Sequence, residues 1–332
     1  MWIAVDAMGG DAGPAVVVPG AIEGARRFGV ALTLVGATSE IDRALGGVSQ
    51  EGVDLTIVDA PETIGMDEHP SLAVRRRSQS SIHLALEQVK SGNAAAMVSA
   101  GNSGAVMAAA LLILGRIPGI ERPAIGSVIP SATGRSLLLD LGAVTDPRPQ
   151  HLVQIARMGA IAASATLGVV QPRVALLSNG SEPTKGNRLV QEVFPLLQAE
   201  QDLNFVGNIE GNDLFHGKAD VIVTDGFTGN IALKTAEGTV SLITEALRAE
   251  VTRTLPRKLA ALVLRPAFRS LRARMDYREV GGAPLLGVNG VAVIAHGRSD
   301  QRAIANAIGV AKHVVEAGLV QAIAEDMKRR AG

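Results

Sequence analysis

The stretch Ala219-Asp-Val-Ile-Val-Thr-Asp-Gly-Phe-Thr-Gly-Asn230 begins as an apolar run of strand length and ends in a glycine-containing turn. The run is apolar at consecutive positions, as is typical of a parallel strand that helices cover on both faces. The turn mixes glycine with short polar side chains, which favour the first positions of a helix. The stretch therefore predicts one strand–turn–helix unit of a layered α/β protein.

The same order recurs along the whole chain. Besides 219–224, the expected strands are 3–6, 31–35, 55–59, 94–99, 136–140, 173–178 and 205–207. The helix-length segments between them are 14–28, 81–91, 102–114, 150–167 and 185–200. Repeated β-then-α order implies a largely parallel sheet flanked by helices, with right-handed crossovers. We expect residues 1–332 to form a single α/β catalytic domain, with two lobes around a cleft as the alternative arrangement.

Composition narrows the class of protein. The chain has 332 residues, of which 47% are hydrophobic, enough for a large core. It contains no cysteine, which excludes a thiol nucleophile, a disulfide framework and thiolate metal sites. Its 32 basic and 32 acidic residues balance, so we expect no nucleic-acid partner. No apolar run reaches the roughly 20 residues that span a bilayer, and a cytoplasmic protein is expected.

Four turns stand out because each joins glycine to small polar side chains just before a helix. They are residues 6–11, 99–104, 178–180 and 224–230. In a parallel sheet the carboxyl ends of the strands share one edge, so we expect these turns to meet there. Their backbone N–H groups and the helix N-termini suit an anion such as phosphate. For any one turn, ordinary N-cap chemistry is the alternative.

Residues 251–278 break the strand–helix alternation. Apolar residues recur there at helical spacing, basic residues lie between them, and Asp276 is the only acid. Pro266 should divide the segment into two helices, because a mid-helix proline costs roughly 3 kcal/mol. Such a basic amphipathic excursion can contact an anionic bilayer, dock an acidic carrier protein or pack into the fold. The candidate contact residues are Arg257, Lys258, Leu259, Leu262, Val263, Arg265, Phe268, Arg269, Leu271 and Arg272.

Several common catalytic motifs are missing. No G-x-G-x-x-G follows a strand, residues 180–186 lack the P-loop pattern, and there is no H-E-x-x-H or G-x-S-x-G. The six histidines are dispersed without ligand spacing. The sequence therefore favours chemistry without a metal, an organic cofactor or a covalent intermediate. Phosphate fits as a co-substrate, because its dianion is already a nucleophile that needs only binding and a stabilised oxyanion.

At these turns the chain resembles the bacterial phosphate acyltransferase family, the acyl-carrier-protein:phosphate transacylases of phospholipid synthesis. The matching segments are 5–11, 98–105, 185–187, 219–235 and 281–287. The resemblance implies a sheet similar to phosphotransacetylases and isocitrate or isopropylmalate dehydrogenases, and a homodimer. It implies reversible transfer of a long-chain fatty acyl group from acyl-carrier protein to inorganic phosphate. It also implies that 251–278 associates with a membrane surface or the carrier, and that a downstream membrane glycerol-phosphate acyltransferase is a partner.

The resemblance assigns roles to individual residues. Lys185 would hold the phosphate and stabilise developing negative charge, and Asn230 would donate its amide to the carbonyl oxygen or the phosphate. The residues implied in substrate or phosphate binding are Asp6, Gly9, Gly10, Ser99, Gly101, Asn102, Ser103, Gly104, Asn187, Asp225, Gly226, Thr228 and Gly229. Asp6 and Asp225 are expected to orient neighbouring donors, with a metal role as the alternative.

Three other functions remain open at this point. A phosphotransacetylase would use similar chemistry on a coenzyme A thioester. A metal-dependent decarboxylating dehydrogenase could occupy a similar sheet. A non-catalytic membrane scaffold would bind lipid through 251–278 and show no turnover that depends on phosphate.

Overall fold

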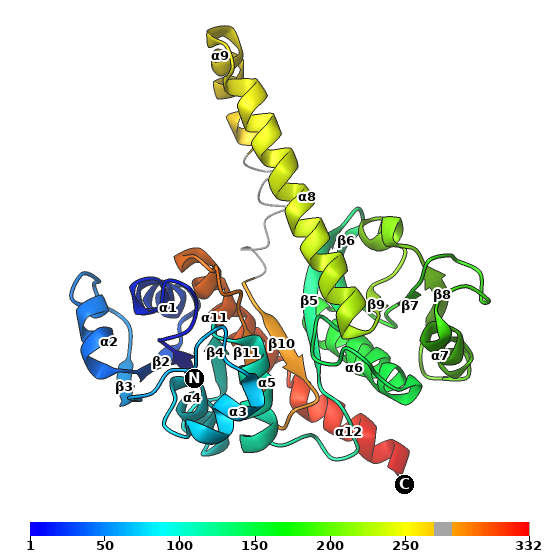
Figure 1. Ribbon diagram of the computed structural model, residues 1–332, viewed down its shortest axis with the longest axis horizontal. Coiled ribbons are helices and arrows are strands. Elements are labelled where there is room, and N and C mark those ends of the chain that lie inside the picture. Colours follow the sequence, from blue (N-terminus) through cyan, green and yellow to red (C-terminus); the bar gives the residue numbers. More distant parts are fainter. Residues whose placement is uncertain (269–280, 332) are drawn as a thin grey trace.

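The computed structural model describes residues 1–268 and 281–331, which form one mixed eleven-stranded sheet covered by helices (Figure 1). The strands are β1 Trp2–Asp6, β2 Ala31–Gly36, β3 Leu55–Asp59, β4 Ala96–Ser99, β5 Ala124–Ser131, β6 Gly134–Leu139, β7 Val174–Leu177, β8 Phe205–Ile209, β9 Val221–Val223, β10 Ala283–Leu286 and β11 Val291–Ile294. The helices are α1 Pro14–Phe28, α2 Thr38–Leu45, α3 Pro70–Arg76, α4 Ser81–Lys90, α5 Ser103–Ile113, α6 Pro149–Leu167, α7 Arg188–Gln198, the 3-10 helix η1 Gly211–Phe215, α8 Gly226–Thr252, α9 Leu255–Val263, α11 Gln301–Glu316 and α12 Leu319–Ala331.

The strand order β3-β2-β1-β4-β11-β10-β5-β6-β9-β7-β8 divides the sheet into two lobes. The first lobe has β1, β2, β3, β4 and β11, all parallel. The second lobe has β6, β7, β8 and β9, also parallel to one another. Strands β10 and β5 join the lobes, and the pairs β11–β10, β10–β5 and β5–β6 are each antiparallel.

Three successive antiparallel pairs reverse the direction of the second lobe relative to the first. The turns 6–11 and 99–104 follow strands of the first lobe, whereas 178–180 and 224–230 follow strands of the second. The prediction that all four turns end at one edge of a single parallel sheet is therefore wrong. Each lobe carries two of them.

All eight strands and five helices predicted from the sequence are present, with small shifts at their ends. The largely parallel sheet flanked by helices is confirmed, and its interior is filled mainly by Ala, Val, Leu and Ile, as the shortage of aromatic residues requires. Helix α1 lies against α11 with unusual closeness, because a Cβ at Gly24 would come within 2.9 Å of the Ala305 backbone. The strands that the sequence did not predict are β5, β10 and β11.

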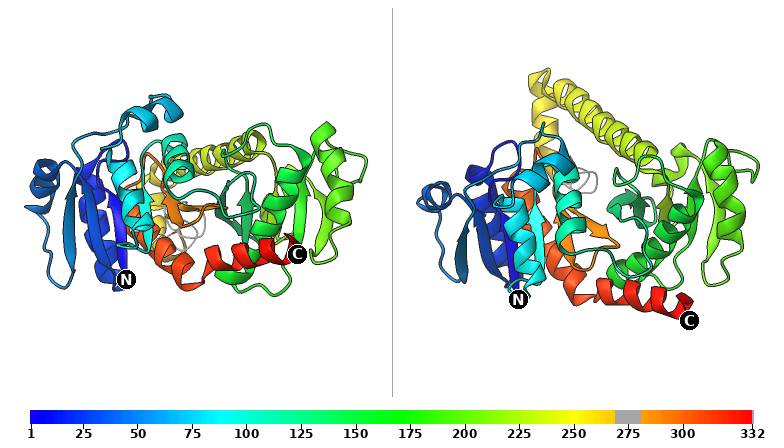
Figure 2. Two further views of the ribbon diagram at one scale, coloured as in Figure 1. Left: turned by 90° about the horizontal axis from the view of Figure 1, so that it is seen from below. Right: turned by 60° about the horizontal axis from the view of Figure 1, so that its bottom comes forward.

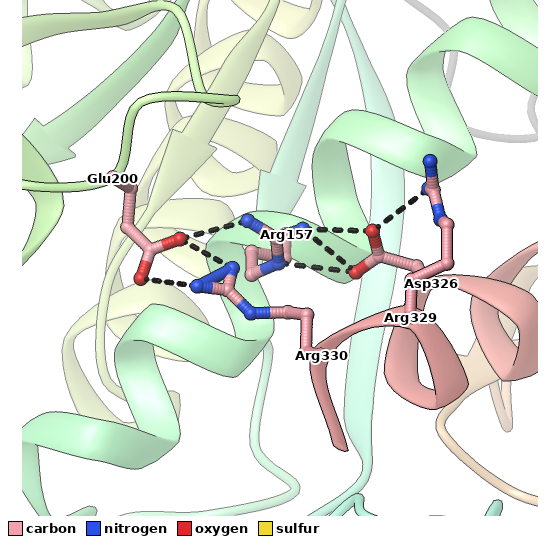
Figure 3. A network of polar contacts seen from close by, with 5 residues as sticks. All are labelled: Arg157, Glu200, Asp326, Arg329 and Arg330. Atoms are coloured by element: carbon pink, nitrogen blue, oxygen red, sulfur yellow. Dashed lines mark hydrogen bonds and ion pairs between the residues drawn. The ribbon is translucent and has the colours of Figure 1, made fainter. Parts of the chain in front are cut away.

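Helix α12 crosses from the first lobe to the second, as both views in Figure 2 show. It is held there by a buried ion-pair network (Figure 3). Arg157 of α6 is 7% exposed, and its guanidinium contacts Asp326 of α12 at 2.7 Å and Glu200, just beyond α7, at 2.7 Å. Arg330 of α12 also contacts Glu200, at 2.6 Å. Because a buried charge left without its partner is costly, this network fixes the C-terminal helix on the second lobe.

Helix α8 leaves the body as a long rod with α9 at its far end (Figure 1). Its only buried residues are Gly226 and Gly229, at its base, and α9 has none. Leu259, Leu262 and Val263 are 58%, 62% and 80% exposed. After a break at Leu264 the chain is helical again over 265–268, consistent with the predicted division near Pro266. Of the predicted contact residues, Arg269, Leu271 and Arg272 lie outside the described residues.

Among the described residues, no single helix is long and apolar enough to cross a membrane. The bent pair α11 and α12 reaches those values only when both helices are taken together.

Candidate active site

Asp6 ties together the two turns of the first lobe. It lies at the end of β1 and is 1% exposed. Its carboxylate accepts hydrogen bonds from Ser99 Oγ at 2.6 Å and from the Met8 N–H at 3.2 Å. Ser99 Oγ in turn accepts from the Gly101 N–H at 3.0 Å. Burial raises the pKa of Asp6, while these hydrogen bonds act in the opposite direction. Asp6 and Ser99 therefore hold the backbones of both turns in register.

Glycine is required where these two turns meet. A Cβ at Gly9 would lie 2.7 Å from the Gly101 backbone nitrogen and 2.8 Å from the Asp6 carboxylate. Gly10 has a φ of +84°, a conformation that side chains other than glycine adopt at a cost. The predicted glycines of the first lobe thus allow close backbone approach.

The remaining polar residues of the second turn differ in what they contact. Asn102 caps α5 by accepting from the Ala105 N–H at 3.1 Å. Its amide nitrogen also lies within hydrogen-bond distance of three carbonyl oxygens in the 65–68 loop. Ser103 is exposed at the start of α5, and Gly104 packs against Pro70. Asn102 therefore shapes the turn, and Ser103 is the residue of the pair whose side chain faces solvent.

In the second lobe, Lys185 stands on a loop whose backbone is firmly held. Asn187 caps α7 by accepting from the Val190 N–H at 3.0 Å. The Gly186 N–H donates to the Asn179 side chain at 2.9 Å, and Gly186 has a φ of +99°. Lys185 itself is exposed. The loop between β7 and α7 therefore presents a lysine from a fixed backbone, without burying its charge.

The base of α8 is built in a similar way. Asp225 caps the helix by accepting from the Thr228 N–H at 2.8 Å and from the Thr228 hydroxyl at 2.7 Å. The Gly226 N–H donates to the Val144 carbonyl at 2.8 Å. Asn230 follows in the next turn and is exposed. The carboxylate of Asp225 is hydrogen-bonded to Thr228, whereas the side-chain amide of Asn230 is exposed.

Asp140, which had no predicted role, packs against the base of α8. It follows β6, is fully buried, and accepts from the backbone N–H groups of Ile125 at 2.9 Å and Val144 at 2.7 Å. Burial raises its pKa, and the backbone hydrogen bonds oppose the rise. A Cβ at Gly226 would come within 2.8 Å of its carboxylate. The one signal in the sequence was its place at the end of a predicted strand, as for Asp6.

The two lobes contribute to the site in different ways. Strands β7 and β9 are neighbouring and parallel, so the loops that carry Lys185 and Asn230 leave the same edge of the second lobe. The turns around Asp6 and Ser99 belong to the first lobe. Helix α8 connects them, because Lys234 Nζ lies 2.6 Å from Nε2 of His296, which follows β11. Within residues 1–268 and 281–331, no cluster of three or more His, Asp or Glu side chains could hold a metal ion.

Comparison with known proteins gives the family. The sequence profile described as "Fatty acid synthesis protein" matches residues 1–322. A "Phosphate acyltransferase" of Desulfitobacterium hafniense is 48% identical over 330 residues, which cover 99% of this chain and 98% of that relative. The chain belongs to the phosphate acyltransferase family. It is therefore an enzyme that transfers an acyl group to phosphate, as the resemblance predicted.

Two solved structures share the fold of this enzyme. The first is a phosphotransacetylase from Streptococcus pyogenes, with a TM-score of 0.63 and 19% identity, covering 95% of this chain and 94% of that one. The second is a branched-chain phosphotransacylase from Enterococcus faecalis, with a TM-score of 0.58 and 12% identity, covering 95% and 99%. At these identities the likeness concerns the fold, and it confirms the predicted similarity to the phosphotransacetylase sheet.

Proposed function

We propose that this enzyme transfers a long-chain fatty acyl group reversibly from acyl-carrier protein to inorganic phosphate, giving acyl phosphate for phospholipid synthesis. The family supplies acyl transfer to phosphate. The observation that carries the proposal is the pairing of Lys185 and Asn230 on loops that leave one edge of the second lobe, each exposed on a backbone fixed by its neighbours.

In the proposed reaction a phosphate oxygen attacks the thioester carbonyl carbon, and the carbonyl oxygen becomes an oxyanion. The Lys185 ammonium group attracts the phosphate dianion and offsets its charge as it meets the acyl group. The Asn230 amide donates a hydrogen bond to the developing oxyanion, where a fixed donor is worth most. The contact of α8 with His296 brings the first lobe to this helix, and we assign its turns, with Gly9, Gly101 and exposed Ser103, to the facing wall. No metal or organic cofactor takes part in this scheme.

The tip of the α8–α9 arm supports the proposal that the enzyme works at the cytoplasmic face of a membrane. Leu259, Leu262 and Val263 are exposed there, and Arg257 and Lys258 lie beside them in α9, with Arg265 and Phe268 just beyond. Exposed apolar side chains among basic ones suit an anionic lipid surface. An acidic carrier protein is the other partner that such a surface fits. A membrane glycerol-phosphate acyltransferase would then receive the acyl phosphate.

The outer half of α8 supports the proposal of a homodimer. Leu242, Ile243 and Leu247 are 68%, 55% and 39% exposed on a helix that leaves the body. Val240, Ile243, Leu247 and Val251 recur at spacings of three and four residues, the pattern of a helix that packs along a partner helix. A second copy of this helix would cover that stripe.

The proposal is tested with purified enzyme, a defined long-chain acyl-carrier protein and inorganic phosphate. We expect release of carrier thiol that requires phosphate, and an equal amount of acyl phosphate trapped as hydroxamate. Acetyl coenzyme A is the matched donor for the phosphotransacetylase alternative. Turnover of acetyl coenzyme A without turnover of the acyl carrier would overturn the donor assignment, and lipid binding without any phosphate-dependent turnover would favour a scaffold.

A further inference from the structure

Lys234 and His296 make a contact between the lobes that the scheme above does not use. Lys234 is on α8 of the second lobe, and His296 follows β11 of the first. Lys234 Nζ lies 2.6 Å from His296 Nε2 and 2.8 Å from Glu237 Oε2. The His296 Nδ1 atom lies 3.1 Å from the Arg298 backbone nitrogen. A lysine, an imidazole and a carboxylate are thus joined in one chain of contacts.

The position of this contact ties it to the proposed reaction centre. Lys234 follows Asn230 by four residues, so the two side chains lie one above the other on the same face of α8. On the other side, β11 pairs with β4, and the Ala295 N–H donates to the Ser99 carbonyl at 2.8 Å. The next residue is His296. The pair therefore stands between Asn230 and the turn that begins at Ser99.

Lys185 and Asn230 do not account for stabilisation of the leaving thiolate. When phosphate displaces a carrier thiol, the carbon–sulfur bond breaks and its electron pair goes to sulfur. An alkyl thiolate leaves the tetrahedral adduct less readily than the phosphate that has just added, unless a proton or a cation meets it. Lys185 is occupied with the entering phosphate, and an amide cannot serve as an acid.

We propose that Lys234 is the acid that protonates the departing thiolate, and that His296 is a positioning residue that also returns the proton to it. This inference rests on the proposed function. A phosphate oxygen bonds to the carbonyl carbon, the carbon–sulfur bond breaks, and a proton moves from Nζ to sulfur. The hydroxyl proton of hydrogen phosphate leaves the acyl phosphate and restores the pair. The sum is thioester plus hydrogen phosphate giving acyl phosphate plus thiol.

The hydrogen bonds of His296 suit that task. A neutral imidazole has one donor and one acceptor nitrogen. An ammonium group has donors only, so the 2.6 Å contact makes Nε2 the acceptor of an Nζ–H, and the lone pair that can take up and return a proton faces Nζ. Burial lowers the pKa of His296, and the charge of Lys234 lowers it further, so the neutral ring is favoured. Glu237 holds the amine at the other side.

The test compares two donors that differ only in the leaving group. A long-chain acyl pantetheine has an alkyl thiol, and the matching acyl thiophenol has a far more acidic thiol that leaves without a proton. We expect Lys234→Met to lower kcat by about 10²-fold with the alkyl thioester and by less than about 3-fold with the aryl thioester. His296→Gln should show the same selectivity with a smaller loss. Lys90→Met, at an exposed site on α4, is the matched control and should change neither.

Several outcomes decide the matter. An equal loss with both thioesters in a folded Lys234→Met enzyme would overturn the inference and leave the proposed function standing. Full activity of Lys234→Met or Lys234→Gln with the alkyl thioester would overturn it as well. Lys234→Arg keeps the charge but cannot give up its proton, so rescue by arginine would contradict the acid role. If the wild-type enzyme released neither thiol in a phosphate-dependent way, the proposed function itself would fail.

Discussion

The base and the outer half of α8 are one continuous helix under two different sets of constraints. At the base, a Cβ on Gly229 would collide with the carbonyl oxygen of Asp140. Further out, a Cβ on Gly238 would meet nothing within 4 Å, and Leu242 is 68% exposed. The same residue type is thus required by packing at one position and is only a weak helix former at the other. The difference predicts that the proposed chemistry at the base and the proposed association at the outer half are separable by mutation.

The largest expected effect comes from comparing a buried charge in the body of the protein with an exposed charge on the α8–α9 arm. Arg157→Met removes the centre of the buried network, and we expect a loss of about 3–5 kcal/mol in the free energy of unfolding. Arg257→Met removes an exposed contact to Glu250 on the arm and should cost less than about 1 kcal/mol. Urea unfolding of both variants measures the difference. Equal losses would mean that the arm contributes to stability as the body does.

A change at the base of α8 should next separate turnover from stability. Asn230→Ala should lower kcat by about 10²-fold or more, because it removes a donor from the proposed oxyanion site, with no change in melting temperature. The matched variant Thr239→Ala lies further out on the helix, where its hydroxyl donates to the Thr235 carbonyl, and should keep kcat within about 2-fold. Steady-state kinetics with phosphate and a long-chain donor provide the measurement. Similar kcat values for Asn230→Ala and wild type would contradict the assignment.

The tip of the arm should show the reverse behaviour. Leu259→Ser together with Leu262→Ser should weaken binding to anionic vesicles by at least about 10-fold, since each buried leucine is worth about 1.5–3 kcal/mol. Turnover of an acyl pantetheine, a donor without a carrier protein, should stay unchanged. The control is Val170→Ser, which alters an apolar side chain that is 89% exposed on the body. Vesicle sedimentation gives the answer, and unaltered binding of the double variant would remove the tip from the proposed membrane contact.

The two glycines give the smallest and most direct test of the contrast. Gly229→Ala should destabilise the protein by about 1–3 kcal/mol, because the added methyl group must displace the Asp140 carbonyl or the helix. Gly238→Ala should stabilise it by up to about 1 kcal/mol, because alanine is the better helix former at an open position. Thermal melts of the two variants should therefore move in opposite directions. A shift of the same sign in both would mean that the two halves of α8 are constrained alike.

Much of this fold could be predicted from the sequence because the parallel strands are apolar at consecutive positions. Of the strands that were missed, β5 and β10 have weaker patterns, whereas β11 is apolar throughout but only four residues long. Residues 124–131 contain both Gly126 and Pro130, and 283–286 is a four-residue strand with Pro284. Each pairs with its neighbour in the chain, β5 with β6 and β10 with β11, whereas the pair β10–β5 joins residues far apart in the sequence. Their pairing reverses the second lobe, and no local pattern carries that information.

Some residues of the candidate site could likewise be predicted from the sequence, and others could not. The turns with Asp6, Lys185 and Asn230 could be predicted, since each mixes glycine with a helix-capping residue at the end of a strand. The role of Asp140 could not, because its partner Ile125 belongs to a strand that the sequence did not reveal. The contact between Lys234 and His296 joins residues 62 positions apart, and only the path of α8 brings them together.

The central claim is that the second lobe holds a free phosphate ion beside a thioester through Lys185 and Asn230. The most direct measurement is the rate of thiol release from a long-chain acyl carrier as phosphate is varied, for wild type and for Lys185→Ala. The account predicts saturation with phosphate in the wild type, and a loss of about 10²-fold or more in Lys185→Ala with an unchanged melting temperature. Thiol release that ignores the phosphate concentration, or a folded Lys185→Ala enzyme with wild-type rates, would contradict it.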